Sequence, residues 1–99
     1  MSNRGTVSKK TPTIAEIKVW TAEKQPYFFS KSTMKAFGQT LKDFTVVRSP
    51  QGNIFIYAPM RDVGSVFRGW TFRKYENGDL LLELGFLNLE EIKKYISEH

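Results

Sequence analysis

Residues 70–86 read WTFRKYENGDLLLELGF, and this stretch decides the fold class. Asn77-Gly78 separates two runs rich in aromatic and branched residues, which are typical of β-strands. The Asn-Gly dipeptide favours the tight turn of a β-hairpin. The sequence therefore predicts two antiparallel strands, over residues 70–76 and 80–86.

The length of this turn sets which side chains share a face. A two-residue turn pairs Phe72 with Glu83, whereas a three-residue loop over residues 76–78 pairs Phe72 with Leu82. A one-residue slip exchanges the two faces, because side chains alternate with a period of two. The better apolar match predicts the three-residue loop, with Gly78 as a left-handed bulge residue.

A second hairpin is predicted upstream. Residues 44–48 (FTVVR) and 54–58 (IFIYA) flank a loop in which Pro50 and Gly52 provide the backbone angles of a turn. Both faces of the 54–58 strand are apolar, so the sheet needs cover on both sides. We expect the two predicted helices to cover one face. The other face would then expose aromatic residues, or meet a protein partner or a second copy of the chain.

Two helices complete the predicted fold. The first covers about residues 31–42, begins after Ser30 as N-cap, and has an apolar face that includes Met34 and Leu41. The second covers about residues 89–97, with Asn88 as its cap.

The first quarter of the chain is less patterned. Residues 14–20 (IAEIKVW) fit both helical and strand spacing, and their β-branched and aromatic residues favour a strand. Tyr27–Phe29 is predicted as another short strand. Residues 1–12 are polar and basic, which predicts a disordered arm. We therefore expect an α+β fold: one domain over residues 13–99, with a mostly antiparallel sheet of about four to five strands.

Composition excludes several chemistries. The chain has no cysteine, and its single histidine is the last residue, His99. A disulfide scaffold, a Cys-ligated metal and a His-based catalytic triad are therefore not expected. Nucleotide-binding and nucleophile-elbow motifs are missing from the sequence as well. We expect a protein that is not an enzyme and that uses no cofactor and no metal.

Positive charge is concentrated in the first half of the chain. The whole chain carries a net charge of +5; residues 1–48 contribute +6 and residues 49–99 contribute −1. Such an excess favours polyanionic partners, although a net charge of this size is also common for solubility alone. No apolar run approaches the roughly 18 residues of a membrane span. We expect a cytoplasmic protein without membrane contact.

Two further segments suggest binding. Pro59–Gly69 is long for a hairpin loop and mixes arginines with apolar residues; it is either a binding loop or a plain connection that runs into the next strand. Arg68–Tyr75 partly matches the aromatic and basic pattern of the RNA-recognition motif. However, an Asn-Gly hairpin follows it, where that motif has a helix. The alternative is that Trp70 and Phe72 face the core and leave Arg73 and Tyr75 solvated.

The basic and aromatic residues in these regions are the candidates for contact with a partner or a nucleic acid. They are Lys9, Lys10, Lys31, Lys35, Arg61, Arg68, Arg73 and Tyr75.

Residues 27–38 (YFFSKSTMKAFG) resemble the opening of small phage- and plasmid-borne proteins of uncharacterised function. These proteins have an aromatic-Phe-Ser opening, two variable residues and Thr-Met, matched here by Thr33 and Met34. Tyr57-Ala58-Pro59, Thr71-Phe72-Arg73 and Gly78-Asp79-Leu80 are similar to the hairpins that follow in that family. The resemblance covers roughly residues 27–80. It implies a small accessory protein of a mobile element, in a bacterial or archaeal host.

We therefore expect a non-enzymatic accessory protein that binds a protein encoded by the host or by the element. The alternative is a protein that binds DNA or RNA through the basic arm and an Arg/aromatic sheet surface. A homodimer is a further expected assembly.

Overall fold

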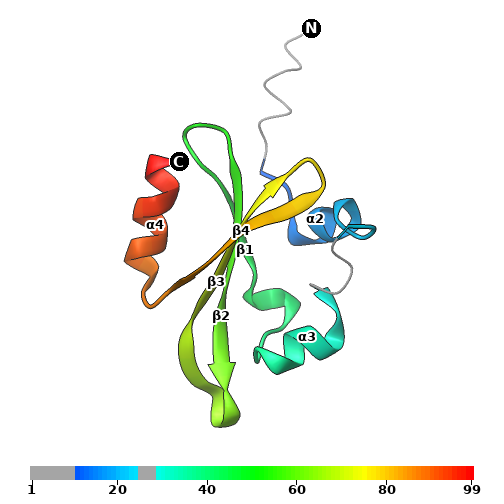
Figure 1. The fold of residues 1–99 in the computed structure, drawn as a ribbon, viewed down its shortest axis with the longest axis vertical. Helices are drawn as coiled ribbons and strands as arrows, with labels where there is room; N and C mark the ends of the chain where they lie inside the picture. Colours follow the sequence, from blue (N-terminus) through cyan, green and yellow to red (C-terminus); the bar gives the residue numbers. More distant parts are fainter. Residues whose placement is uncertain (1–10, 25–28) are drawn as a thin grey trace, which may run out of the picture.

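Four strands form one antiparallel sheet, in which each strand pairs with the next along the chain. The computed structural model describes residues 11–24 and 29–99 (Figure 1). In chain order the elements are α2 (Ile14–Trp20), α3 (Lys31–Ala36), the 3₁₀ helix η2 (Leu41–Asp43), β1 (Thr45–Arg48), β2 (Ile54–Asp62), the 3₁₀ turn η3 (Val63–Ser65), β3 (Val66–Glu76), β4 (Asp79–Phe86) and α4 (Leu89–Glu98). The predicted α+β class and antiparallel sheet are confirmed. Residues 1–10 of the predicted arm lie outside the described residues, and Pro12 is buried.

The β3–β4 turn corrects the predicted register. Glu76 pairs with Asp79, so Asn77-Gly78 is a two-residue turn, and both of its residues have a positive φ (52° and 86°). The apolar match is restored further along, where Phe72 pairs with Leu84. Between Leu81 and Leu84, two residues of β4 lie opposite one residue of β3, which is a β-bulge. The predicted three-residue loop was wrong. The change in which side chains share a face comes from a bulge inside the strands and not from a longer turn.

The predicted long loop Pro59–Gly69 is mostly strand. Strand β2 continues to Asp62 and β3 begins at Val66, which leaves a connection of three residues. A second bulge lies between Met60 and Arg61, where the register shifts and Gly69 adopts a φ of +118°. The pairs with β1 end at Tyr57 and those with β4 end at Trp70. Residues 59–69 therefore form a two-stranded extension, called the projecting hairpin below (Figure 1).

Residues 14–20 form a helix, so the strand predicted there was wrong. Thr13 is the N-cap: the Glu16 N–H donates to Thr13 Oγ1 at 3.2 Å, and the Thr13 N–H donates to Glu16 Oε1 at 2.8 Å. This reciprocal capping box satisfies free amides of the first turn. Ile17 is fully buried, and this burial outweighs the β-propensity of the segment. Of the predicted strand at residues 27–29, only Phe29 is described; it is buried and lies outside any strand.

Helix α3 begins as predicted but ends early. Ser30 Oγ accepts from the Thr33 N–H at 3.2 Å and caps the helix. At the other end the Gln39 N–H donates to the Met34 carbonyl, and the Gly38 N–H donates to the Lys35 carbonyl. With Gly38 at a φ of +62°, these bonds form a Schellman motif. The helix predicted over residues 31–42 therefore ends at Ala36, because its glycine acts as a terminator.

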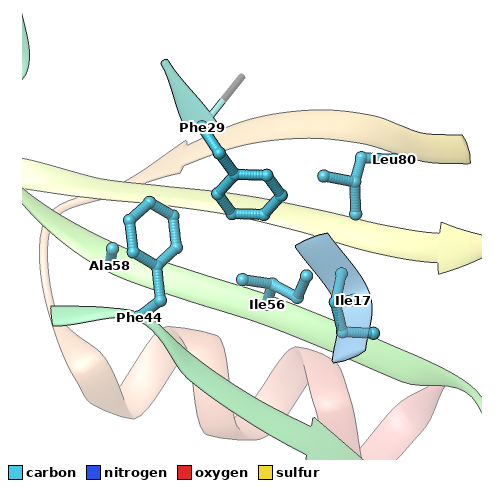
Figure 2. Packing of buried hydrophobic residues seen from close by; sticks show 6 residues of the cluster. All are labelled: Ile17, Phe29, Phe44, Ile56, Ala58 and Leu80. Atoms are coloured by element: carbon cyan, nitrogen blue, oxygen red, sulfur yellow. The ribbon is translucent and has the colours of Figure 1, made fainter. Parts of the chain in front are cut away.

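The helices cover both faces of the sheet, which corrects the expectation that they share one face (Figure 1). On the α2 and α3 side a cluster of buried residues contains Ile17, Phe29, Phe44, Ile56, Ala58 and Leu80 (Figure 2). On the other side Ile92 of α4 packs against Phe55 and Phe72, both of which are buried. The rings of Phe55 and Phe72 stack at 5.2 Å, and Tyr95 of α4 meets the Phe72 ring edge-on at the same distance. Helix α4 follows the predicted range and cap: the Glu91 N–H donates to Asn88 Oδ1 at 2.9 Å.

Arg61 of the projecting hairpin fastens the α3–η2 segment to the sheet. Its backbone N–H donates to the Phe37 carbonyl at 2.8 Å, and its guanidinium donates to the Gly38 carbonyl at 2.9 Å. The same guanidinium pairs with the Asp43 carboxylate at 3.0 Å. This hydrogen bond holds the pKa of Asp43 below its ordinary value of 3.8. Arg61 therefore sets where α3 and η2 lie on the sheet.

The close contact at Gly38 leads to a first prediction. A Cβ atom at this position would lie 2.8 Å from Arg61 Cβ and 2.9 Å from the Arg61 carbonyl oxygen. We expect Gly38→Ala to lower the free energy of unfolding by about 2–4 kcal/mol, from the left-handed backbone and the clash together. Urea denaturation measures this loss.

Gly52→Ala is the matched control. Gly52 also has a positive φ, of +93°, but no atom lies within 4 Å of its added Cβ. Its loss should be only the backbone cost, about 1 kcal/mol. Equal losses for the two variants would contradict the contact between Gly38 and Arg61.

The Asp43–Arg61 pair leads to a second prediction, on pH. A carboxyl whose pKa is lowered by folding stabilises the fold above its unfolded pKa, and this stabilisation is lost as the pH falls through the folded pKa. We therefore expect Asp43→Asn to be less stable than the wild type at neutral pH. The difference should shrink below about pH 4. Denaturant melts of both proteins at several pH values test this, and a pH-independent difference would contradict it.

Candidate protein-interaction groove

A hollow lined by three lysines lies between α3 and η2. Its lining residues are Lys31, Met34, Lys35, Gln39, Thr40, Leu41 and Lys42. Lys31 and Lys35 are four residues apart on α3, so their side chains project from the same side of the helix. The Schellman motif at Gly38 turns the chain back, and this turn brings η2 beside α3. The hollow therefore exists because the helix ends at Ala36.

A second hollow continues from the first at Leu41. It is lined by Ile14, Ala15, Lys18, Val19, Ala22 and Leu41. Except for Lys18, these side chains are aliphatic, and Val19 is 73% exposed. Leu41 lines both hollows and is itself exposed. Together they form one surface, called the lysine groove below, with an aliphatic floor and with Lys18, Lys31, Lys35 and Lys42 along it.

Two acidic residues near the lysine groove already have partners. Glu16 closes the capping box of α2, and Asp43 pairs with Arg61. Within the described part of the chain, no ion pair joins any of the four groove lysines to an acidic residue. The groove therefore offers positive charge beside apolar surface, and an anionic, partly apolar ligand complements both features.

The predicted contact residues are dispersed. Lys31 and Lys35 lie in the lysine groove. Lys9 and Lys10 lie outside the described residues. Arg61 is occupied by Asp43 and the Gly38 carbonyl, and it is half-buried. The Arg61 guanidinium therefore holds the α3–η2 segment in place, and its contact with a partner stays a prediction.

The remaining three candidates lie on β3. Arg68 is exposed on the projecting hairpin, 3.9 Å from Asp62. Arg73 is only 8% exposed, which does not fit the predicted solvated face. Tyr75 packs its ring against Trp20 of α2 at 5.5 Å and forms part of the core on that side. Within the predicted Arg/aromatic sheet surface, Tyr75 is thus covered by Trp20 of α2 and Arg73 is buried, whereas Arg68 is exposed.

Sequence reasoning missed Lys18, Lys42 and the aliphatic floor of the groove. Residues 14–20 were predicted as a strand, so Lys18 and Val19 were placed on opposite faces of it. The signal that could have corrected this was the Thr13–Glu16 capping-box spacing. Lys42 falls inside the helix predicted over residues 31–42, and the break at Gly38 places it in the groove instead.

The described residues bring together no group of three His, Asp or Glu side chains that could hold a metal ion. None of the helices among them is long and apolar enough to cross a membrane.

Comparison with protein-family models finds none that matches the chain, and comparisons with curated proteins and with solved structures find no match either. The function is therefore inferred from the geometry of the lysine groove.

Proposed function

We propose that this chain is a small non-enzymatic accessory protein that binds an acidic, amphipathic segment of a partner protein in the lysine groove. The observation that carries the proposal is the combination of four lysines with an aliphatic floor. Acidic side chains of the partner segment pair with the lysines, while its apolar side chains cover Val19 and Leu41. An amphipathic helix laid into a groove presents its residues in this way.

The floor of the groove favours protein over nucleic acid. Proteins that bind single strands stack bases on aromatic side chains. Here the floor is aliphatic, and Tyr75 packs against Trp20 in the core instead. A binder of phosphates alone gains nothing from burying Ile14, Val19 and Leu41.

The absence of cysteine and the position of the single histidine at residue 99 support a binding role over catalysis. The resemblance to phage- and plasmid-borne proteins supports a partner encoded by the host or by the mobile element.

A third prediction tests the groove with a defined probe. The probe is a labelled amphipathic peptide of about 15 residues, roughly four helical turns, with Glu on one face and Leu on the other. We expect it to bind the wild-type protein, and we expect its affinity to fall between about 50 and 200 mM salt. The double variant Lys31→Glu/Lys35→Glu should weaken binding about tenfold or more, because two attractions become repulsions. Fluorescence anisotropy measures both effects.

Matched controls separate the effect of net charge from specific binding in the lysine groove. Lys93→Glu/Lys94→Glu makes the same charge change on exposed positions of α4, across the sheet from the groove, and should leave binding unchanged. Leu41→Asp should weaken binding of the Glu/Leu peptide, since it removes an apolar contact shared by both hollows. Equal binding of a Lys/Leu peptide would contradict the proposal. Tight, salt-sensitive binding of DNA or RNA that is lost on deleting residues 1–10 would instead favour the nucleic-acid alternative.

A further inference from the structure

The projecting hairpin carries exposed apolar surface that the lysine groove does not use. Val63 is 89% exposed and Phe67 is 48% exposed; Val66 is also exposed. Leu87, which follows β4, is 77% exposed and approaches Gly69 at the base of the hairpin. An apolar group of this kind at the end of an extended element is typical of an interaction surface.

A row of aromatic rings joins this surface to the core on the α4 side. The ring of Tyr57 meets Trp70 edge-on at 5.7 Å, and Trp70 meets Phe67 at the same distance. Trp70 packs against the cluster that contains Phe72. The bulge at Arg68 places Phe67 next to Trp70 although three positions separate them. Phe67 is therefore held by packed neighbours while half of its surface stays exposed.

The projecting hairpin also lacks a third strand along part of β3. Residues 66–69 of β3 lie beyond the last β4 pair, so within the described chain β2 is their only strand neighbour. Two-stranded ribbons are marginally stable in water, and a further strand or packed layer stabilises them. On the α3 side Arg61 connects the ribbon to Phe37 and Gly38. In Figure 1 the tip extends past both α3 and α4, so it can approach another molecule without collision of the bodies.

The charges of the projecting hairpin indicate which molecule binds it. The projecting hairpin holds three charged residues, of which Arg61 pairs with Asp43. The other two, Asp62 and Arg68, carry opposite charges, lie 3.9 Å apart, and are both more than half exposed. The tip is therefore neutral overall on a chain with a net charge of +5. Two copies of a cationic chain repel each other through surfaces such as the lysine groove, but not through a neutral, apolar one.

We infer that the projecting hairpin is a self-association surface, where the hairpin of a second copy packs around a two-fold axis. A two-fold interface brings the same patch from both copies together, so it must be complementary to itself. The exposed Phe67 and Val66 cover their counterparts, and Asp62 of each copy faces Arg68 of the other. This assembly leaves both lysine grooves free.

The fourth prediction concerns the oligomeric state of the full chain. Sedimentation equilibrium of the wild type up to about 100 µM should show a dimer, and the dimer should strengthen with salt as the charge repulsion is screened. Phe67→Asp should raise the dissociation constant about tenfold or more by placing a carboxylate in the apolar contact. The control Val19→Asp changes an exposed apolar residue of the lysine groove and should leave the dimer intact. A wild type that stays monomeric over this range overturns the inference.

Disulfide trapping tests the geometry directly. Because the chain has no cysteine, any disulfide formed by a single introduced cysteine joins two copies. Val66→Cys should form the linked dimer on mild oxidation about tenfold or more faster than Lys93→Cys on α4, since only the hairpin residues are held near each other. Equal rates, or a dimer that Phe67→Asp does not weaken, would overturn the inference. Faster trapping at residue 66 that Phe67→Asp abolishes would support it.

Discussion

The pairing of β2 with β3 is the constraint on which the rest of the structure depends. Strand β2 carries apolar side chains on both faces, with Phe55 on one side and Ile56 and Ala58 on the other, and Phe72 of β3 packs on the Phe55 side. A sheet of this kind cannot leave either face in water, so the helices must divide between the two sides. Helix α4 covers the side that contains Phe55 and Phe72, and α2 with α3 covers the side that contains Ile56 and Ala58. Two surfaces then remain for binding. The covering helices form the lysine groove, and the end of the projecting hairpin extends beyond them.

Arg61 shows how a basic residue acquires its role from its three-dimensional neighbours. In the sequence it is one of several cations near apolar residues, and nothing local distinguishes it from Arg68. In the structure its guanidinium reaches Asp43 and the Gly38 carbonyl, whereas Arg68 is exposed and lies 3.9 Å from Asp62. Both arginines belong to the projecting hairpin, but Arg61 shapes the lysine groove by fixing α3 and η2, whereas Arg68 is exposed on the surface of the hairpin. A substitution at Arg61 disturbs binding through the shape of the groove rather than through a direct contact.

The two proposed surfaces differ in chemistry and in their response to salt. The lysine groove attracts an acidic segment, so screening weakens its binding. The projecting hairpin is neutral and apolar, so screening relieves the repulsion between two cationic copies. A dimer joined at the hairpins presents two grooves at once. A partner with two acidic segments then gains avidity from the second contact without any new interface.

The sequence by itself determined the two hairpins, the cap of each predicted helix and the α+β class, because turn dipeptides, capping residues and alternation act within a few neighbouring residues. The Asn77-Gly78 hairpin, the Ser30 and Asn88 caps and the loop at Pro50 all follow from such short-range rules. Only the tertiary structure decided the rest. Burial of Ile17 made residues 14–20 a helix. Helix α3 ends at Ala36, where Gly38 contacts Arg61. A bulge within the strands, rather than the turn, set the β3–β4 register. The lysine groove escaped sequence reasoning for the same reason, since Lys18 and Lys35 lie along one surface only after two helices and a 3₁₀ turn pack on the same side of the sheet.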